Sequence, residues 1–504
     1  MKVVEMKNIT KRFPGMIANK NINFDLRKQE VHVLLGENGA GKTTLMNILY
    51  GIYNQDEGDI FINGEKTKIS TPKDAISKGI GMVHQHFMLV HNFTVAENIV
   101  LGHEPTKFKF IFDKSSVNEK VEKLIDKYDF NIDLNSKIHD ISVGQQQKVE
   151  ILKMLYRGAD IIILDEPTAV LTPDEIKELG DIMNNLVNEG KSIILITHKL
   201  KEVMSMSDRV TIIRKGELID TLNTEDTSIE ELANLMVGRQ VDLNVYTEKS
   251  KEFGNVLSIR NLMAKDNRGI DAIKGLNLDV KYGEIFGIIG VDGNGQSELV
   301  EVLTGIRKCC GGEILFNGED IKNLSAKDII NKNVVSIPED RHKTGLVLQH
   351  SLYENSILGM QHLSKFSKGI FLDYKKIRDH AKRIIEEFDV RTISDSVNAS
   401  ILSGGNQQKF IIGREIYKNP KLIIAVQPTR GLDVGSIEYI HKRLIEERNN
   451  GKAILLISLE LDEILSLSDR IGVIYNGNIP RVLDRKEADE NKIGILMAGG
   501  VFGG

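Results

Sequence analysis

Runs of apolar residues along the chain predict buried strands alternating with helices. Residues 161–164 and 192–196 are almost entirely apolar, which is typical of central strands of a parallel sheet covered on both faces. Residues 118–130 are amphipathic, and helical patterning between about residues 94 and 140 predicts a separate helical subdomain. Short β-rich runs open each half of the chain. The pattern therefore predicts an α/β protein with a largely parallel core sheet.

An internal repeat divides the chain into two similar halves. Residues 31–41 resemble residues 285–295, so that Gly36 corresponds to Gly290 at an offset of 254. Residues 142–148 resemble residues 403–409, at an offset of 261, which predicts a small insertion in the second half. We expect domains at 1–239 and 256–504, joined by a polar and charged linker at 240–255.

The composition is that of a globular protein without the basic surface of a nucleic acid-binding protein. Among 504 residues, 66 Lys and Arg stand against 71 Asp and Glu, for a net charge of -5, which disfavours a nucleic acid partner. No apolar stretch approaches the ~18 residues of a membrane-spanning helix, and the N-terminus does not resemble a signal peptide. We therefore expect a cytoplasmic protein. Cys309 and Cys310 are adjacent and predict neither a disulfide framework nor a metal site.

Residues 36–43 fit the pattern G-x-x-x-x-G-K-[ST] between an apolar run and a helical stretch, in the order that a phosphate-binding loop requires. Backbone N–H groups of such a loop, with the following helix N-terminus, face phosphate oxygens. Lys42 would neutralise the terminal phosphates, and Thr43 would hold Mg²⁺ through its hydroxyl. The predicted phosphate-binding set is Gly36, Glu37, Asn38, Gly39, Ala40, Gly41, Lys42, Thr43 and Thr44.

A pair of carboxylates follows the predicted strand at 161–164. Asp165 and Glu166 would stand at the carboxyl end of that strand, where ligands of open α/β sheets bind. Phosphoryl transfer needs a carboxylate that holds the metal and a group that positions the attacking water. We assign Asp165 to Mg²⁺ and Glu166 to the water. An Asp-Glu pair without the phosphate loop would more often be a helix N-cap.

Two further segments indicate a family. Residues 142–145 and 403–407 resemble the signature motif of ATP-binding cassette (ABC) ATPases, and the order of motifs in the first half is that of the family. The resemblance covers nearly the whole chain twice. It implies two tandem P-loop ATPase domains, each with a mainly parallel core sheet, an antiparallel β subdomain and a helical subdomain. It also implies that ATP binds between the phosphate loop of one cassette and the signature motif of the other.

The resemblance assigns roles to three more positions of the first half. Phe13 would stack on adenine, Gln85 would sense Mg²⁺ and the transport partner, and His198 would contact the γ-phosphate. Phe13 as a core residue and His198 as a strand-end cap remain alternatives. The expected catalytic residues are Glu166, His198 and Lys42, and the expected Mg²⁺ ligands are Thr43, Gln85 and Asp165.

The second half is a degraded copy. At the two offsets, the positions with catalytic roles are replaced: Lys42 by Gln296, Asp165 by Val426, Glu166 by Gln427, His198 by Leu459, Gln85 by Glu339 and Phe13 by Asn267. The resemblance then implies one competent ATP site and one degenerate site. The competent site would be completed by Ser403, Gly404, Gly405 and Gln407. The degenerate site would comprise Gly290, Asn294, Gly295, Gln296 and Ser297 with Ser142, Gly144 and Gln145.

Fused cassettes of this kind resemble the energy-coupling ATPase subunits of bacterial importers for simple sugars or nucleosides. Residues 82–98 are most similar to nucleoside importers, and a monosaccharide importer is the alternative. The resemblance implies a peripheral protein on the cytoplasmic face of the cell membrane. Its partners would be two integral-membrane permease subunits, docking near Phe87–Thr94, and an extracellular substrate-binding protein or lipoprotein.

Two other classes of ATPase are less consistent with the sequence. Soluble tandem cassettes that act on ribosomes or DNA usually have a long basic arm between the cassettes and two intact sites, whereas this linker is short and mixed in charge. A regulatory ATP-binding protein without turnover is disfavoured by the presence of Asp165, Glu166 and His198.

Overall fold

The computed structural model divides into two compact units, Met1–Val241 and Asp242–Gly504. It describes residues 1–85, 87–104, 106–107, 111–112, 114–128, 130, 132–168, 171, 173–241, 253–291, 293–497 and 499–500. Most of the predicted linker, 242–252, lies outside these residues. No helix in the described part of the chain is both long enough and apolar enough to span a bilayer.

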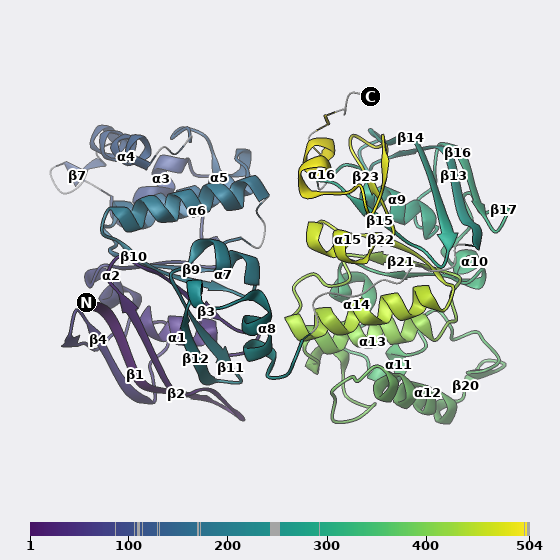
Figure 1. The fold of residues 1–504 in the computed structure, drawn as a ribbon, viewed down its shortest axis with the longest axis horizontal. Helices are drawn as coiled ribbons and strands as arrows, with labels where there is room; N and C mark the ends of the chain where they lie inside the picture. The colour runs from purple at the N-terminus through teal and green to yellow at the C-terminus, as the bar shows by residue number, and fades with distance from the viewer. Residues whose placement is uncertain are drawn as a thin grey trace. The chain divides into compact units, whose positions relative to one another are not determined.

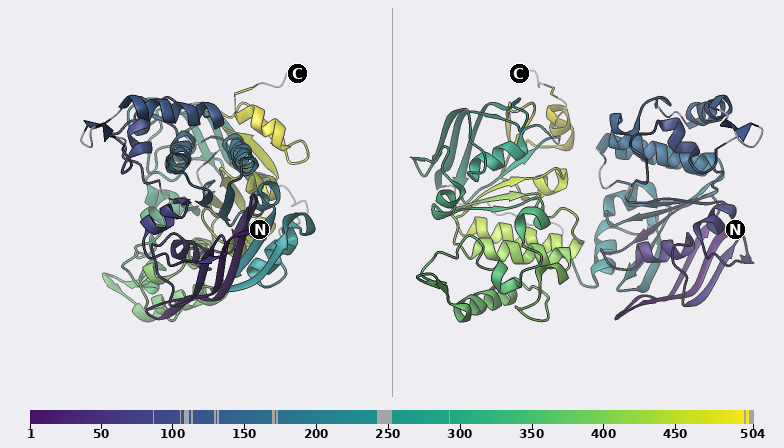
Figure 2. Two further views of the ribbon diagram at one scale, coloured as in Figure 1. Left: turned by 90° about the vertical axis from the view of Figure 1, so that its left-hand side faces the viewer. Right: turned by 180° about the vertical axis from the view of Figure 1, so that it is seen from behind.

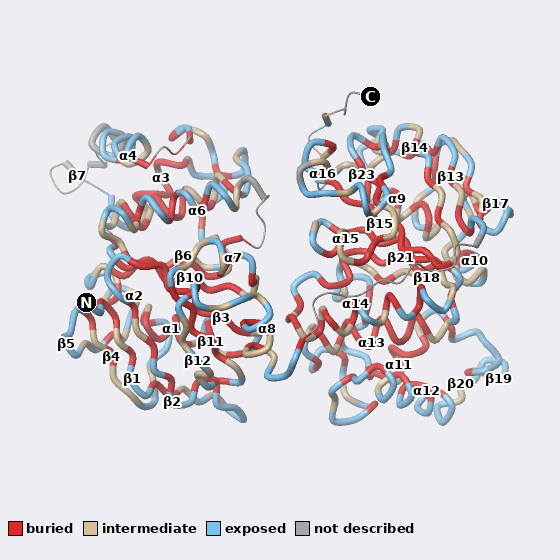
Figure 3. The backbone as a smooth tube through the Cα atoms, in the orientation of Figure 1, coloured by how far each residue is buried: buried red, intermediate tan, exposed pale blue. Residues whose placement is uncertain are grey.

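The core of the first unit is a six-stranded sheet in the order β12-β11-β3-β10-β9-β6. Its strands are β3 (Val31–Leu35), β6 (Ile80–Val83), β9 (Ile161–Asp165), β10 (Ser192–Thr197), β11 (Arg209–Arg214) and β12 (Glu217–Asn223). All neighbours are parallel except β11 and β12. Every residue of β3, β9 and β10 is buried (Figure 3). The predicted parallel core sheet is thus confirmed.

A second sheet in this unit is antiparallel. It has the order β2-β1-β4-β5 and consists of β1 (Lys2–Phe13), β2 (Met16–Arg27), β4 (Glu57–Ile62) and β5 (Glu65–Lys66). Its apolar face packs with helix α1 (Lys42–Leu49) against one face of the core sheet. Helix α2 (Pro72–Ser77), capped by Thr71, leads into β6.

Helices cover the other face of the core sheet in this unit (Figure 1). The helical subdomain contains α3 (Val95–Val100), the hairpin of β7 (Thr106–Lys107) and β8 (Ile111–Phe112), α4 (Lys114–Tyr128), the 3-10 turn Ile138–Asp140 and α5 (Val143–Tyr156). The helical patterning predicted between about residues 94 and 140 covers α3 and α4 of this subdomain, and α5 follows it. The remaining helices are α6 (Pro173–Asn188), α7 (Leu200–Met206) and α8 (Ile229–Val237), with a 3-10 turn at Thr224–Asp226.

The second unit repeats this architecture (Figure 2). Its core sheet has the order β18-β21-β22-β15-β23-β24, and its antiparallel sheet the order β14-β13-β16-β17. The strands are β13 (Phe253–Lys265), β14 (Asp271–Tyr282), β15 (Ile285–Ile289), β16 (Gly311–Phe316), β17 (Glu319–Asp320), β18 (Val334–Ile337), β21 (Leu422–Val426), β22 (Ala453–Ile457), β23 (Arg470–Val473) and β24 (Val482–Asp484). The strand order matches that of the first unit, as the sequence repeat predicts.

The second unit has its own helical subdomain and a small hairpin within it. The helices are α9 (Gln296–Leu303), α10 (Ala326–Asn331), α11 (Leu352–Asn355), α12 (Tyr374–Glu387), α13 (Gly404–Ile416), α14 (Val434–Asn449), α15 (Leu461–Leu467) and α16 (Glu490–Met497), with a π-helical turn at Arg341–Gly345 and a 3-10 turn at Ala399–Ile401. Strands β19 (Ser367–Lys368) and β20 (Phe371–Leu372) form the hairpin.

Two details of the sequence alignment change. Thr94 and Ser351 cap equivalent helices at an offset of 257, so the insertion is split between the segments before and after α11. Phe13 pairs with Met16, whereas the matching hairpin of the second unit turns between Lys265 and Asp271. The constant offset that aligned Phe13 with Asn267 is therefore wrong there, and Lys265 occupies the last paired position.

Candidate functional site

The predicted phosphate loop connects β3 to α1, and helix α1 begins at Lys42. Two glycines permit its close packing. Gly41 has φ 101°, and a Cβ at this residue would lie 2.3 Å from the carbonyl oxygen of Ala18. A Cβ at Gly36 would lie 2.3 Å from the carbonyl oxygen of Ile213. The loop is thus held against two neighbouring segments that admit no side chain at these positions.

Lys42 lies inside this loop. Its ammonium group donates hydrogen bonds to the carbonyl oxygens of Gly36, at 2.6 Å, and Glu37, at 3.0 Å. Burial lowers the pKa of Lys42, while the carboxylates of Glu166 and Asp165 act in the opposite direction. The cation therefore lies where a phosphate chain cradled by the loop would bind.

Asp165 ends strand β9 and is 3% exposed. Its carboxylate accepts a hydrogen bond from the Thr43 side chain, but its buried Oδ1 atom has no hydrogen-bond partner among the residues that the structure describes. Burial, together with the charge of Glu166, raises the pKa of Asp165 to about 6. A buried carboxylate oxygen without a partner, beside a hydroxyl group, fits a hard cation such as Mg²⁺.

Glu166 lies between Gln85 and His198. Its Oε2 accepts a hydrogen bond from Gln85 Nε2 at 2.9 Å, and its Oε1 lies 3.1 Å from His198 Nδ1. Burial opposes ionisation, but the hydrogen bond and charge of His198, with the charge of Lys42, hold the pKa of Glu166 below its usual value. Glu166 is thus an ionised carboxylate at neutral pH, oriented from two sides.

The backbone of Glu166 has φ 48°, in the left-handed region. Its N–H donates to the carbonyl oxygen of Ile196 at 2.9 Å. This turn directs the side chain toward the ends of β6 and β10, which carry Gln85 and His198. Three sequence-predicted residues from three segments therefore meet at the carboxyl edge of the core sheet.

Replacement of Asp165 by asparagine is expected to stabilise the protein when metal and nucleotide are absent. The pKa of Asp165 is about 6 in the folded state and 3.8 in the unfolded chain, so the folded state binds more protons between these values and loses stability as pH rises through them. The gain should be at most about 3 kcal/mol near pH 7.5 and about half of that near pH 5. Urea unfolding with EDTA at both pH values measures it. A gain that does not shrink on acidification would contradict the assignment.

The sequence-predicted adenine residue, Phe13, is half-buried at the tip of the β1–β2 hairpin. Its ring meets the edge of Tyr53 with ring centroids 5.4 Å apart, and the Lys11 ammonium lies 5.6 Å from its centroid. The stacking role of Phe13 stays a prediction.

The second unit retains the shape of the phosphate loop without its cation. Helix α9 begins at Gln296, followed by Ser297, and Gly295 has φ 105°. Gln296 Nε2 donates to the carbonyl oxygen of Val291 at 3.0 Å, in place of the lysine bonds. Asn294 bonds the same oxygen at 3.0 Å. A neutral amide thus fills the position at which Lys42 supplies charge in the first unit.

The second unit also retains the backbone turn that carries Glu166. Gln427 has φ 47°, and its N–H donates to the carbonyl oxygen of Ile457 at 2.7 Å. The neighbouring Val426 offers no metal ligand. Glu339, which takes the place of Gln85, forms an ion pair with Arg430. The second unit thus keeps the backbone turn of Glu166 but lacks the two carboxylates that hydrolysis would need.

The two predicted signature segments differ at their first residue. Ser142 caps α5, with a reciprocal capping box in which its hydroxyl accepts from Gln145 N and Gln145 Oε1 accepts from Ser142 N. Ser403 precedes α13 without such a bond, and its hydroxyl accepts from Asn406 Nδ2 at 2.9 Å. Ser403 is therefore exposed at the start of a helix that its side chain does not cap, beside Gly404 and Gly405.

Gln407 is held from both ends within the second unit. It is buried, its amide donates to the carbonyl oxygen of Ala399 at 3.0 Å, and its Oε1 lies 2.9 Å from His342 Nε2. Both ends of the side chain are bonded inside the second unit, and its contact with ATP stays a prediction.

A sequence model of the family described as ABC transporter matches residues 19–169 and 273–430, more than half of the chain. The chain belongs to the ABC transporter family. Each unit is therefore an ABC cassette.

Relatives match the protein over almost its full length. It is 53% identical over 498 residues to the nucleoside import ATP-binding protein NupA of Lactococcus lactis, covering 99% of this chain and 98% of the relative. It is 55% identical to the guanosine import ATP-binding protein NupO of Bacillus subtilis, covering 99% and 97%. The glucose import ATP-binding protein TsgD13 of Haloferax volcanii is 45% identical, covering 99% and 96%.

One solved structure shares the fold over nearly the whole chain. The complex of the archaeal ribosomal stalk protein aP1 with the ribosome recycling factor aABCE1 matches 97% of this chain and 92% of that chain with a TM-score of 0.65, at 17% identity. At that identity the likeness concerns the fold alone.

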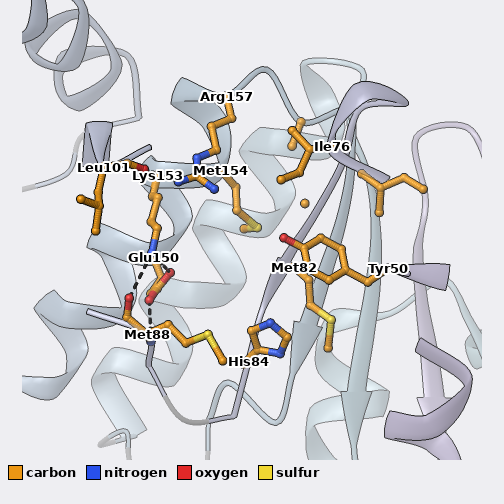
Figure 4. A pocket seen from close by; sticks show the side chains of 13 residues that line it. Tyr50, Ile76, Met82, His84, Met88, Leu101, Glu150, Lys153, Met154 and Arg157 are labelled. Carbon is orange, nitrogen blue, oxygen red and sulfur yellow. Dashed lines mark hydrogen bonds and ion pairs between the residues drawn. The ribbon is translucent and has the colours of Figure 1, made fainter. Parts of the chain in front are cut away.

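The first cassette has a pocket beside the predicted docking segment (Figure 4). It measures about 190 Å³ and lies between the core sheet and helix α5. Glu150 of α5 accepts from the backbone N–H of Met88 at 2.8 Å, and Lys153 donates to the carbonyl oxygen of Met88 at 3.2 Å. Two side chains of α5 thus fix the segment that follows Gln85.

Two contributors to these sites were not identified from the sequence. Asn19 is fully buried, and its amide donates to the carbonyl oxygen of Gly41 at 3.1 Å, which supports the phosphate loop. Arg341 donates to the carbonyl oxygen of Arg430 at 3.2 Å and packs over Gly404. Neither residue lies in a motif, so only the tertiary contacts reveal these roles.

Proposed function

We propose that this protein is the ATP-hydrolysing, energy-coupling subunit of an ABC importer for nucleosides. The observation that carries the ATPase is the Gln85–Glu166–His198 arrangement beside Lys42 and Asp165 in the first cassette. The substrate class is supported by the names of relatives that are 53% and 55% identical over nearly the whole chain. A monosaccharide importer is the second candidate, favoured by a glucose import relative at 45% identity.

In the proposed mechanism, Lys42 and the N-terminus of α1 bind the β- and γ-phosphates of ATP. Glu166, ionised and oriented by Gln85 and His198, accepts a proton from the attacking water. Thr43 and the free Oδ1 of Asp165 would hold Mg²⁺, with Gln85 nearby. The metal would neutralise charge on the phosphates. His198, from the end of β10, would face the γ-phosphate.

Completion of the site is proposed to come from the second cassette, as in the family. Ser403, Gly404 and Gly405 present a hydroxyl and helix N–H groups that suit phosphate oxygens. Gln296, Val426 and Gln427 leave the second cassette without its own catalytic groups, so we propose a single hydrolytic site. The complementary degenerate site would have Ser142, Gly144 and Gln145 opposite the loop 290–297.

The proposed partners are integral-membrane permease subunits, with an extracellular substrate-binding protein in the same system. We propose that this protein lies at the cytoplasmic face of the membrane and receives a permease segment near residues 87–94. Met88, Val90 and Phe93 are exposed there. The pocket lined by Met88 continues this surface. The hydrogen bond from Gln85 to Glu166 connects the surface with the proposed catalytic carboxylate.

Reconstitution into vesicles tests the substrate class. The protein is co-expressed with the permeases encoded beside it and supplied with its binding protein, and uptake of labelled guanosine, ribose and glucose is compared. We expect ATP-dependent uptake of the nucleoside only. Uptake of ribose or glucose without guanosine would reject the nucleoside proposal and favour the sugar importer. Recovery with ribosomes rather than permeases would reject import altogether.

A further inference from the structure

The hairpin β19–β20 in the second cassette carries consecutive exposed apolar side chains. Ile370 is 91% exposed, Phe371 73% and Leu372 37%. Tyr374, at the start of α12, is also exposed. Apolar side chains scattered singly over a surface need no explanation, but a contiguous group at a projecting turn marks a contact surface. We call residues 370–372 and Tyr374 the apolar tip.

The apolar tip stands on a firm base. Phe366 is fully buried in a small core with Ile357, Met360 and Ile377. The backbone N–H of Asp373 donates to the carbonyl oxygen of Phe366 at 2.9 Å, which closes the hairpin. Gly369, with φ 66°, makes the turn and leads directly into Ile370. The buried core around Phe366 and the hydrogen bond of Asp373 therefore fix the hairpin with its tip exposed.

Positive charge surrounds the tip. Residues 361–383 contain five lysines and two arginines against two aspartates, a net +5, in a chain of net charge -5. Lys365 lies over the ring of Phe366, 4.9 Å from its centroid, and its pKa is lowered by burial and by the nearby Arg383. Two cations are thus close enough to repel each other beside Phe366, at the base of the hairpin.

Much of this charge is not neutralised locally. Arg378 pairs with Asp395 at 2.8 Å, and Lys376 lies 3.8 Å from Asp373. Among the described residues, no carboxylate lies within 4.0 Å of Lys375, Lys382 or Arg383. Helix α12 buries Ile377, Ala381 and Ile384 while these cations remain exposed. The exposed cations of α12 therefore follow the apolar tip directly in the chain.

We propose that the apolar tip and the cations of α12 contact an anionic lipid surface. Apolar side chains at a turn enter the interface between headgroups and acyl chains, and exposed lysines and arginines nearby bind anionic headgroups. The combination selects lipid as the occupant, because a membrane with anionic headgroups offers negative charge to the cations and an apolar layer to the tip. This contact goes beyond import and needs no permease.

Vesicle sedimentation tests the proposal with the full-length protein. Vesicles of phosphatidylcholine alone are compared with vesicles containing about 30% phosphatidylglycerol. We expect binding to the anionic vesicles only, weakening as salt is added. The double variant Ile370→Asp/Phe371→Asp should reduce binding by about tenfold or more. The double variant Lys375→Gln/Lys382→Gln should reduce it by a similar factor.

Matched variants separate the tip from general effects of surface charge. Ile393→Asp changes an isoleucine that is 92% exposed in the same cassette but lies outside the tip. Lys308→Gln/Lys327→Gln removes two exposed lysines elsewhere in that cassette. Both controls should bind vesicles as the unchanged protein does, and all variants should keep its basal ATPase rate.

Three outcomes would overturn the proposal. They are no binding to the anionic vesicles, unchanged binding by the tip variants, and equal loss in the controls. If the tip variants bind vesicles normally but fail to assemble with the permeases, the tip contacts protein and the lipid proposal is wrong. A failure of nucleoside uptake would leave these results unaffected, so the two proposals can fail separately.

Discussion

Replacing Glu166 by glutamine is expected to lower ATP turnover by at least about 10²-fold, and by up to about 10⁴-fold, because a positioned general base contributes on that scale. The amide retains the size of the side chain and one of its two acceptor oxygens, but it cannot accept the proton of the attacking water. ATP binding should persist, since Lys42 and the loop 36–43 are unchanged. Steady-state phosphate release and equilibrium ATP binding measure the two effects.

The second cassette supplies the matched control. Gln427 already occupies the same left-handed turn, with φ 47° against 48° at Glu166, so glutamine is compatible with this backbone. Gln427→Ala should leave turnover close to that of the unchanged protein. Substantial ATPase activity in Glu166→Gln would contradict the single-site proposal, and so would a large loss in Gln427→Ala.

The second large effect is expected on ATP affinity. Lys42→Gln replaces the buried ammonium by the amide that the second cassette carries as Gln296, whose Nε2 donates to the carbonyl oxygen of Val291. The loop should therefore keep its shape while losing a charged hydrogen-bond donor to phosphate. That loss is worth about 1.5–3 kcal/mol, or about 10- to 100-fold in the dissociation constant for ATP. Isothermal titration calorimetry measures it directly.

The reverse replacement is the informative control for Lys42. Gln296→Lys restores a cation to the second cassette, but Val426 and Gln427 still lack carboxylates. Turnover should not rise in Gln296→Lys, and it should not be rescued in Lys42→Gln/Gln296→Lys. Recovery of hydrolysis in the double variant would show that the second loop can support chemistry by itself.

The core sheets and the motif positions could be predicted because they depend on local pattern. The largely apolar runs at 161–164 and 192–196 became the central strands β9 and β10, and the glycine-rich segment 36–41 became a turn between strand and helix. The repeat fixed the architecture of the second cassette in the same way. These features need only neighbours in sequence, or the same pattern twice.

Other features depend on contacts between distant residues and could not be predicted. The sequences at Ser142 and Ser403 look alike, but only Ser142 closes a capping box, because Gln145 is replaced by Asn406 in the second cassette. The inward position of Gln407 depends on His342, more than sixty residues away. The β13–β14 hairpin turn of the second unit is longer than the β1–β2 turn of the first. An offset measured at Gly290 does not detect this difference, so it aligned Asn267 with Phe13 wrongly.

The bonds of Lys42 to its own loop have a consequence for ligand selectivity. A ligand that binds Lys42 must compete for its ammonium with the carbonyl oxygens of Gly36 and Glu37, which already accept hydrogen bonds from it. A single monovalent anion offers little more than these oxygens do, whereas a polyphosphate brings several charged oxygens at once. The loop thus competes with the ligand for the ammonium and sets a threshold that chloride would fail to cross at concentrations where ATP succeeds.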